Sequence, residues 1–438
     1  MFETVRNAFK LKEIRSRIIY TLLMLVVVRI GTQLPIPGVN GSYFSEWFSG
    51  NSGSAFGFFD AITGGSFEKM SVFALNITPY ITSSIIIQLL TIAIPKLEEL
   101  QKDGEEGRKK MTAITRYLTV ALALMESLAM AIGFGKSGLL LEYNALNIIT
   151  AVVTLTAGST VIMWIGERIT ENGVGNGISI VLTINIISRI PQDLTLLFEQ
   201  FVKGKEIAFQ VLNLAIIVAI IIAVTVLTVT LQGAERRIPV QYSRKVQGRK
   251  QIGGQSSYIP LKVNTAGVIP IIFAQSLFMF PLIIMQLLGK SGGNGIGGTI
   301  LKMLNQSNWC DFNEPIYSIG LIVYIVLVIA FAYFYTSITF NPLEIADNMK
   351  KQGGFIPGIR PGKPTSDYLT KILNYIIFIG AVGLVIVAVI PIFFEGAFNA
   401  SISFGGTSLI IIVGVIIETL KQIESRMLVR NYKGFLND

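Results

Sequence analysis

Four ionisable side chains interrupt otherwise apolar stretches of the sequence: Arg29, Glu126, Arg189 and Glu418. Ion-coupled pumps commonly carry buried acids of this kind along a proton relay. Glu126 is the one acid well inside an apolar stretch, because Glu418 lies close to a polar end where it can reach water. The four residues therefore give only weak support to a relay.

The residue types that the chain lacks exclude several kinds of chemistry. It has no histidine, which excludes histidine-based catalysis, haem ligation through histidine and most zinc sites. Its single cysteine, Cys310, allows no internal disulfide, and we expect an unpaired thiol in a loop. No Walker-type phosphate-binding sequence is present, so energy from ATP would have to come from a partner. We therefore expect neither enzymatic activity nor a metal or cofactor.

The composition indicates a membrane protein. Of 438 residues, 51% are hydrophobic and 14% are charged, whereas a typical soluble domain has about 25% charged residues. Apolar runs long enough to cross a bilayer as helices recur along the whole chain. The sequence therefore predicts an all-α polytopic membrane protein.

Apolar runs bounded by charged or Gly/Pro-rich stretches predict ten spans. They lie near residues 18–34, 71–94, 117–134, 148–165, 178–195, 208–231, 264–288, 316–338, 372–394 and 404–420. The fifth is the weakest, because Arg189 and Pro191 interrupt it. The first lacks a small-residue cleavage motif and is followed by Pro35 and Pro37, so we expect it to be retained rather than removed as a signal peptide.

The distribution of basic residues predicts the orientation. Most of the 36 Lys and Arg residues lie in the two tails and in the even-numbered connections between spans. Under the positive-inside rule, both termini and these connections face the cytoplasm. Five spans in residues 1–200 and five in 201–438 make two halves of opposite topology, an arrangement that in transport proteins places the functional path between the halves. A ten-helix bundle without internal symmetry fits the hydropathy equally well.

The outer connection between the first two spans is unusually apolar. Residues 55–67, which we call the plug segment, read AFGFFDAITGGSF, with three phenylalanines before Asp60 and two glycines after it. The pattern suits a short, mobile helix that is too short to cross a bilayer. A re-entrant or buried segment is one interpretation, and an interfacial helix is the other.

Two cytoplasmic connections do not resemble simple loops. Residues 232–263 hold seven basic residues and one acid, and their alternation around IPVQYS predicts a projecting β-hairpin with a basic tip. These charges could anchor topology or contact anionic lipid, or they could dock an acidic partner or RNA. Residues 339–371 contain GFIPGIRPG, in which prolines restrict the backbone on either side of Arg360. We expect a rigid turn that displays Arg360.

Six motifs in register along the chain resemble the SecY family, the channel subunits of the bacterial protein translocase. They are LPIPGVN, NITPYITSSIIIQLL, ENGVGNGIS, LKVNTAGVIPIIFAQS, GGFIPGIRPGKPT and FGGTSLIIIVGV, and together they extend over essentially the whole chain. The resemblance implies two five-helix halves around an hourglass pore in the bacterial plasma membrane. Unfolded polypeptides would cross through the pore, and apolar segments would leave it sideways into the lipid bilayer.

The resemblance also assigns residues and partners. It implies a pore ring of Ile81, Ile85, Leu182, Ile272 and Ile411, and a plug that includes Phe56, Phe58, Phe59, Ile62, Gly64 and Gly65. It implies a docking surface for the motor ATPase SecA and the ribosome at Arg236, Arg237, Arg244, Lys245, Arg249, Lys250 and Arg360. SecE and SecG would be small membrane partners. The lateral gate would lie between spans two and three on one side and seven and eight on the other.

Each assignment has an alternative that the residues alone leave open. An apolar ring excludes water and ions by dewetting, but any one of its members could be an ordinary core or lipid-facing residue. Gln88 and Asn264 are polar groups in apolar surroundings, which suits a gate that must open and equally suits a static interhelical hydrogen bond. A secondary transporter for a small solute is the competing class, and it would need converging polar groups near the midplane.

Overall fold

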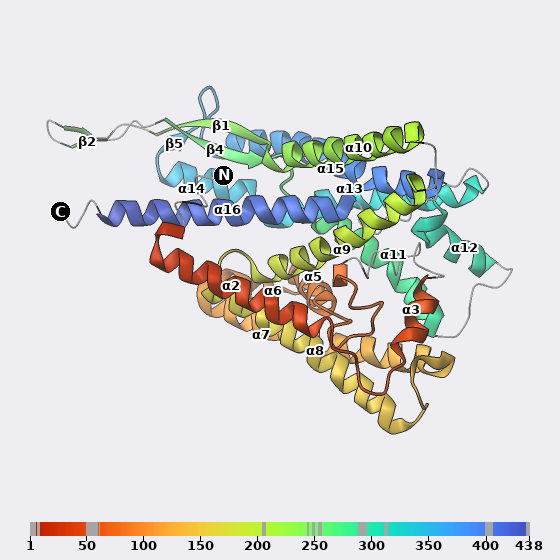
Figure 1. The fold of residues 1–438 in the computed structure, drawn as a ribbon. Coiled ribbons are helices and arrows are strands. Elements are labelled where there is room, and N and C mark those ends of the chain that lie inside the picture. The colour runs from red at the N-terminus through yellow and green to blue at the C-terminus, as the bar shows by residue number, and fades with distance from the viewer. Residues whose placement is uncertain are drawn as a thin grey trace.

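The chain folds into long helices with a small β-sheet at one end, as Figure 1 shows. The computed structural model describes residues 6, 9–49, 60, 62–203, 207–242, 245–247, 250–252, 256–287, 296–310, 314–398 and 406–434. The N-terminal helices are α2 (Lys12–Gly31), α3 (Gly41–Ser49), α5 (Thr78–Ala93), α6 (Pro95–Lys102), α7 (Gly104–Phe134), α8 (Ala145–Asn172) and α9 (Gly177–Phe201). The later helices are α10 (Ile207–Gly233), α11 (Ile269–Leu287), α12 (Ile296–Leu304), α13 (Ile319–Thr339), α14 (Pro342–Lys351), α15 (Lys363–Phe398) and α16 (Gly406–Gly434).

The helices account for the apolar runs of the sequence. Each of the ten predicted spans overlaps one helix among α2, α5, α7, α8, α9, α10, α11, α13, α15 and α16. Among the described residues, six stretches are long and apolar enough to cross a membrane as they stand: Gly104–Phe134, Ala145–Asn172, Gly177–Phe201, Phe209–Gly233, Pro315–Lys351 and Lys363–Phe394. The bent pair α5–α6 makes a seventh if it is one span. The protein therefore has a mostly helical polytopic membrane fold.

The second predicted span differs from its helix at the N-terminal end. The prediction began at residue 71, whereas α5 begins at Thr78. The residues before α5 form turns, and Met70 and Asn76 there have positive φ angles of 45° and 49°. At the other end, Ile94 is extended before Pro95 and the axis turns by 110° into α6. Proline disfavours the helical conformation of the preceding residue, which explains the break.

Helix α9 continues through the residues that made its span the weakest prediction. Its first turn is capped by Asn176, whose side-chain oxygen accepts hydrogen bonds from the backbone N–H groups of Ile178 and Ser179 at 3.2 and 3.4 Å. Pro191 lies inside the helix without ending it. Arg189 is buried, so the interruption in hydropathy is a polar site within a continuous helix.

Contacts between helices fall into two groups. In the first, α2 contacts α8 and α9, while α7 contacts α5 and α8. In the second, α13 packs between α11 and α15, and α16 packs against α10 and α15. Contacts of α9 with α10 and α16, and of α7 with α11, join the two groups. Figure 1 shows α9 alongside α16 where the groups meet.

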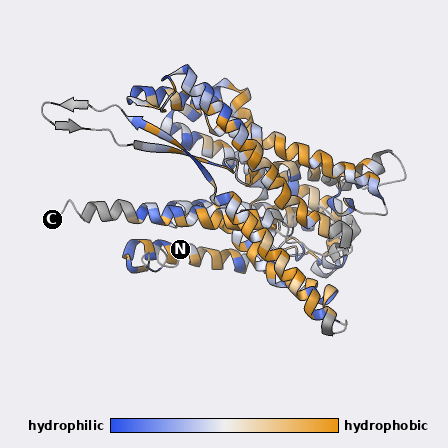
Figure 2. Cartoon of the chain, turned by 90° about the horizontal axis from the view of Figure 1, so that it is seen from above, coloured by the Kyte–Doolittle hydropathy of each residue, from blue (hydrophilic) through white to orange (hydrophobic). Residues whose placement is uncertain are grey.

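A three-stranded antiparallel sheet lies at the end of the molecule that also holds the start of α2 and the end of α16 (Figure 1). Its order is β4 (Ser256–Lys262), β1 (Glu235–Tyr242) and β5 (Gly354–Phe355). A separate pair, β2 (Lys245–Gln247) and β3 (Lys250–Ile252), extends beyond it. Figure 2 shows hydrophobic residues along the middle of the helices and hydrophilic residues gathered toward this end.

Candidate functional site

The residues assigned to the pore ring come from α5, α9, α11 and α16. Those from α5, α9 and α16 include residues that pack against side chains of α9. Leu182 is buried in an apolar cluster that also contains Ile81 of α5 and Ile62 of the plug segment. One turn further along α9, Ile186 packs in another cluster with Ile411 of α16. The i, i+4 spacing of Leu182 and Ile186 puts them on one face of the helix.

The other two ring residues are half-buried. Ile85 lies one turn beyond Ile81 on α5, and Ile272 lies in the first turn of α11. Ile186 was absent from the predicted ring, although its spacing from Leu182 was a signal in the sequence that could have indicated it. Branched aliphatic side chains therefore gather around two successive turns of α9. Ile81 of α5 and Ile62 pack with Leu182 at the first turn, and Ile411 of α16 packs with Ile186 at the second.

The described part of the plug segment is buried. Asp60, Ile62, Thr63 and Phe67 are all buried. Gly64 and Gly65 have φ angles of +70° and +81°, a region that favours glycine. The other plug residues of the prediction, Phe56, Phe58 and Phe59, lie outside the described residues.

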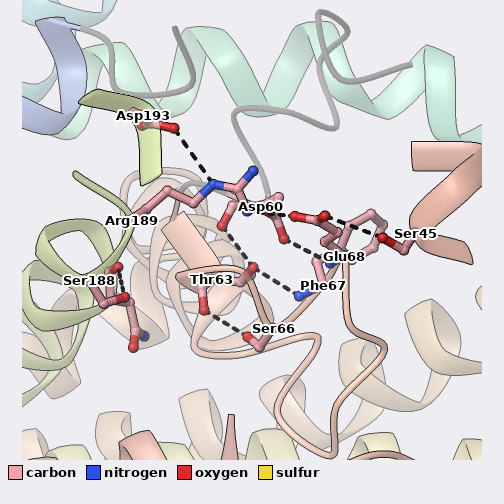
Figure 3. A network of polar contacts seen from close by, with 10 residues as sticks. Ser45, Asp60, Thr63, Ser66, Phe67, Glu68, Ser188, Arg189 and Asp193 are labelled. Carbon is pink, nitrogen blue, oxygen red and sulfur yellow. Dashed lines mark hydrogen bonds and ion pairs between the residues drawn. The ribbon is translucent and has the colours of Figure 1, made fainter. Parts of the chain in front are cut away.

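A network of charged groups joins this segment to α9, as Figure 3 shows. Arg189 Nη1 donates to the carboxylates of Asp60 and Glu68, at 3.0 Å for Glu68 Oε2. The Arg189 Nε atom lies 3.9 Å from Asp193 Oδ1, one turn along α9. The backbone N–H of Glu68 donates to Asp60 Oδ1 at 2.8 Å. One arginine on α9 therefore holds two acids of the connection between α2 and α5.

The sequence indicated Arg189 only as an interruption of a span and did not indicate these partners. Asp193 could have been inferred, because it lies four residues after Arg189 on the same helix face. Asp60 and Glu68 precede Arg189 by more than 100 residues, and only the fold brings them together. Arg29 of α2 lies near the same site, since its Nη1 donates to Asn185 Oδ1 of α9 at 3.5 Å.

The remaining intramembrane acids do not join this network. Glu126 is half-buried on α7, and Glu418 is exposed on α16. Neither forms an ion pair in the part of the chain that the structure describes. Nor do any three Asp, Glu, Cys or His side chains among those residues gather as metal ligands. The structure therefore adds no support for a proton relay.

The gate residues of the prediction lie on different segments, Gln88 on α5 and Asn264 between β4 and α11. Gln88 is half-buried on α5. Asn264 is buried, and its Cα lies 3.6 Å from the Cβ position of Gly380 on α15. Among the described residues no hydrogen bond joins Asn264 Nδ2 to a partner. The contact of α7 with α11 is one of those that join the two groups of helices.

The basic hairpin forms as the sequence pattern predicted, by antiparallel pairing of β1 with β4. Ile238 and Val240 turn inward, and Arg236 and Arg237 face solvent. Arg237 donates to Glu235 Oε1 at 2.7 Å and its guanidinium lies 4.9 Å from the ring centroid of Tyr258. The hydrogen bond to Glu235 raises the pKa of Arg237 above its ordinary value.

The other docking residues surround this sheet. Lys245 lies on β2 and Lys250 on β3, while Arg244 and Arg249 fall outside the described residues. Arg360 is exposed, in the turn that precedes α15. Its carbonyl oxygen accepts a hydrogen bond from the Thr365 hydroxyl at 2.8 Å. Gly358 and Gly362, on either side of it, have φ angles of +81° and +103°, so the turn has the defined shape that its glycines and prolines predict.

Comparison with known proteins matches this chain to one family. The SecY family model matches residues 71–420. The protein translocase subunit SecY of Halalkalibacterium halodurans is 42% identical over 443 residues, covering 100% of both chains.

Solved structures share the fold at lower identity. A protein-conducting channel aligns with a TM-score of 0.62 and 19% identity, covering 94% of this chain and 92% of that one. Sec61 in the canine ribosome–channel complex from the endoplasmic reticulum aligns with a TM-score of 0.61 and 18% identity over the same shares.

Proposed function

The chain belongs to the SecY family, and on this premise we propose that it is the protein-conducting channel of a protein translocase. Unfolded polypeptides pass through it across the plasma membrane, and apolar segments leave it sideways into the bilayer. The observation that carries this conclusion is the packing of Ile81, Leu182 and Ile62 in one apolar cluster. One turn further along α9, Ile186 packs with Ile411 of α16 in a second cluster. Such a constriction excludes water and ions, yet it has no fixed polar group that would trap a passing chain.

The pore lies between an N-terminal half, residues 1–200, and a C-terminal half, residues 201–438. The two groups of helix contacts support this division, because few helix pairs join them. The pore ring then consists of Ile81, Ile85, Leu182, Ile272 and Ile411, with contributions from both halves. The plug segment covers it from the outer side.

Lateral exit takes place between α5 and α7 on one side and α11 and α13 on the other. The contact of α7 with α11 supports this position. Asn264 has a buried amide group without a hydrogen bond among the described residues, and a polar group of this kind favours a surface that rearranges. Gln88 lies on the α5 side of the same seam.

Partners supply the energy and the substrate. The ribosome and a SecA-type motor ATPase dock on the basic hairpin and on the Arg360 turn, while SecE-type and SecG-type subunits assemble in the membrane. Sec61, a relative in fold, is a channel in a ribosome complex, which supports the ribosome as a partner. Both termini face the cytoplasm, together with the sheet. This channel itself carries out no catalysis.

Charged groups converge at Arg189, which a transporter for a small solute could also require. Here they pair with one another and belong partly to the plug segment rather than surrounding an open site. A channel is therefore the better interpretation. The discriminating measurement is ATP-dependent movement of an unfolded secretory polypeptide into vesicles that contain the purified complex and its motor.

The apolar ring itself is tested by conductance. Replacing Ile85 and Ile272 by glycine, or deleting residues 57–66, should raise the resting ion conductance of the complex in planar bilayers, because the barrier is the exclusion of water. A Tyr117→Ala variant, altered at an exposed site on α7, is the control and should conduct as the wild type does. Unchanged conductance in both pore variants would refute the assigned pore.

A further inference from the structure

Asp60 and residues 62–68, which we call the docked turn, rest against the middle of α9. The backbone N–H of Gly65 donates to the Asp60 carbonyl oxygen at 3.1 Å, and Thr63 Oγ1 donates to the same oxygen at 3.1 Å. The backbone N–H of Phe67 in turn donates to Thr63 Oγ1 at 3.3 Å. The turn therefore holds its own shape through short-range hydrogen bonds. A different set of contacts attaches it to α9.

The approach to α9 is close at two glycines. A Cβ atom on Gly64 would lie 2.8 Å from the Asn185 carbonyl oxygen and 2.9 Å from Arg29 Nη1. A Cβ atom on Gly65 would lie 3.4 Å from Arg189 Nη1. The turn and the helix are therefore in direct van der Waals contact, with the guanidinium of Arg189 at their junction.

The charges at this junction are deeply buried. The side chain of Arg189 is 6% exposed, that of Asp60 is 0% exposed and that of Glu68 is 20% exposed. Taking such groups out of water is costly, and only a partner of opposite charge in good geometry compensates that cost. Arg189 is paired with Asp60 and Glu68 only while the docked turn stays in place, whereas its ion pair with Asp193, at 3.9 Å, lies within α9.

The position of Arg189 relates this contact to the constriction. Arg189 follows Leu182 by seven residues on α9, which corresponds to about 10 Å along the helix axis. Ile62 of the docked turn packs in the cluster of Leu182 while Asp60 of the same turn bonds to Arg189. The turn is thus attached to α9 at two levels, one apolar and one ionic.

We propose that Arg189 is the positioning residue that holds the docked turn on α9 through Asp60 and Glu68, and thereby keeps the resting channel closed. This inference rests on the proposed function, since it needs a pore to close. Opening separates Asp60 from Arg189, and water that enters the vacated space then solvates both charges. An ionic contact of this kind is strong in the dry, closed state and weak once the site is wet.

The test places the purified complex and its membrane partners in planar bilayers. It compares the resting ion conductance of each variant with that of the wild type. Arg189→Gln removes the cation, and Asp60→Asn removes one negative charge while it keeps the shape of the side chain. Both variants should raise the open fraction at rest by about tenfold or more. Arg189→Gln leaves the Asp60 carboxylate buried without its cation, and Asp60→Asn removes the fully buried acid by which the turn holds Arg189, leaving Glu68 as the remaining acid of the turn. The double variant Asp60→Asn/Arg189→Gln should leak less than the product of the two single effects, since the groups act on each other.

Two further variants separate this role from general damage. Arg116→Gln breaks another ion pair of the same helix group, whose Nε and Glu167 Oε1 atoms are 2.7 Å apart, and it should conduct as the wild type does. Arg189→Lys keeps the charge and should restore most of the closure. If the Arg189→Gln complex does not assemble, Asp60→Asn alone decides the question.

The outcomes distinguish the proposals. If Ile85→Gly/Ile272→Gly leaks while Asp60→Asn and Arg189→Gln remain closed, the channel stands and the role of Arg189 is refuted. If none of these variants leaks, the assigned pore fails as well. If Arg116→Gln leaks as much as Arg189→Gln, the effect is a loss of general stability and the proposal is overturned.

Discussion

Gln241 of β1 pairs with Phe355 of β5, so the basic hairpin and the connection that carries Arg360 belong to one sheet. Tyr242 pairs with Gly354 in the same register. The two segments proposed for docking, which are more than 100 residues apart in the sequence, are therefore held in a fixed relation. A partner that contacts both meets one preformed surface, which reduces the entropy lost on binding.

Arg360→Glu should impair motor-driven translocation without affecting assembly. Arg360 is exposed, and the turn is shaped by its backbone rather than by this side chain. A charge change at such a site usually alters stability by less than about 0.5 kcal/mol, whereas an arginine that pairs with a partner carboxylate becomes a repelling charge. ATP-dependent translocation into vesicles measures the effect. Lys363→Glu, at the exposed start of α15, is the control, and normal translocation by Arg360→Glu would contradict the docking role.

Neutralising Arg236 should weaken partner binding more than neutralising Arg237. Both side chains face solvent, but Arg237 already pairs with Glu235 and lies over Tyr258. Arg236→Gln should therefore lower the affinity for the ribosome or motor by several-fold, with a larger effect at low salt. Co-sedimentation at two ionic strengths measures both variants. If the basic residues only anchor topology, binding stays normal and protease accessibility of the loops changes instead.

Thr21→Val should destabilise the end of the bundle where α8 and α9 connect. The Thr21 hydroxyl accepts the backbone N–H of Val174 at 3.1 Å and donates to the Arg17 carbonyl oxygen at 3.0 Å. Valine leaves the buried N–H unpaired, at a cost of about 1–3 kcal/mol. The Tm of the purified complex should fall, while Thr112→Val, which loses only an exposed bond within α7, should leave it nearly unchanged. An equal Tm for both variants would show that Thr21 has no such role.

Gly158→Ala should destabilise the packing of α8 against the turns that precede α5. A Cβ atom at residue 158 would lie 2.0 Å from the Val72 carbonyl oxygen, so the backbone must move apart. Overpacking of this kind costs about 1–3 kcal/mol. The control is Gly233→Ala at the end of α10, where the added methyl group would meet open space. A Tm loss that is the same for both would contradict the packing explanation.

The sequence was sufficient to predict the helices, because apolar runs in a membrane must satisfy their backbone groups internally. It was also sufficient for the hairpin, whose alternation around Ile238 and Val240 matches the buried face of β1. The start of α5 at Thr78 was not predictable in this way. Residues 71–77 are apolar enough to read as helix, and the backbone conformations of Met70 and Asn76 end that pattern.

Contacts between distant segments were the part that the sequence could not supply. The hydrophobicity of α9 marked Arg189 as an anomaly, but the identity of its partners depends on where the connection after α2 folds back. The same holds for Ile186, whose contact with Ile411 requires the placement of α16 against α9. Periodicity describes one element at a time and contains no information about which elements meet.

The pairing of Asp60 with Arg189 constrains how the chain can change over evolution. Losing Arg189 alone leaves the Asp60 carboxylate buried without its cation, and losing Asp60 alone leaves Arg189 with only Glu68 and the more distant Asp193, so either change alone carries a cost. Neutral side chains at both positions remove the part of that cost that arises between these two residues. Among relatives, a neutral residue in place of Arg189 should therefore accompany a neutral residue in place of Asp60, and this covariation should be visible in sequences alone.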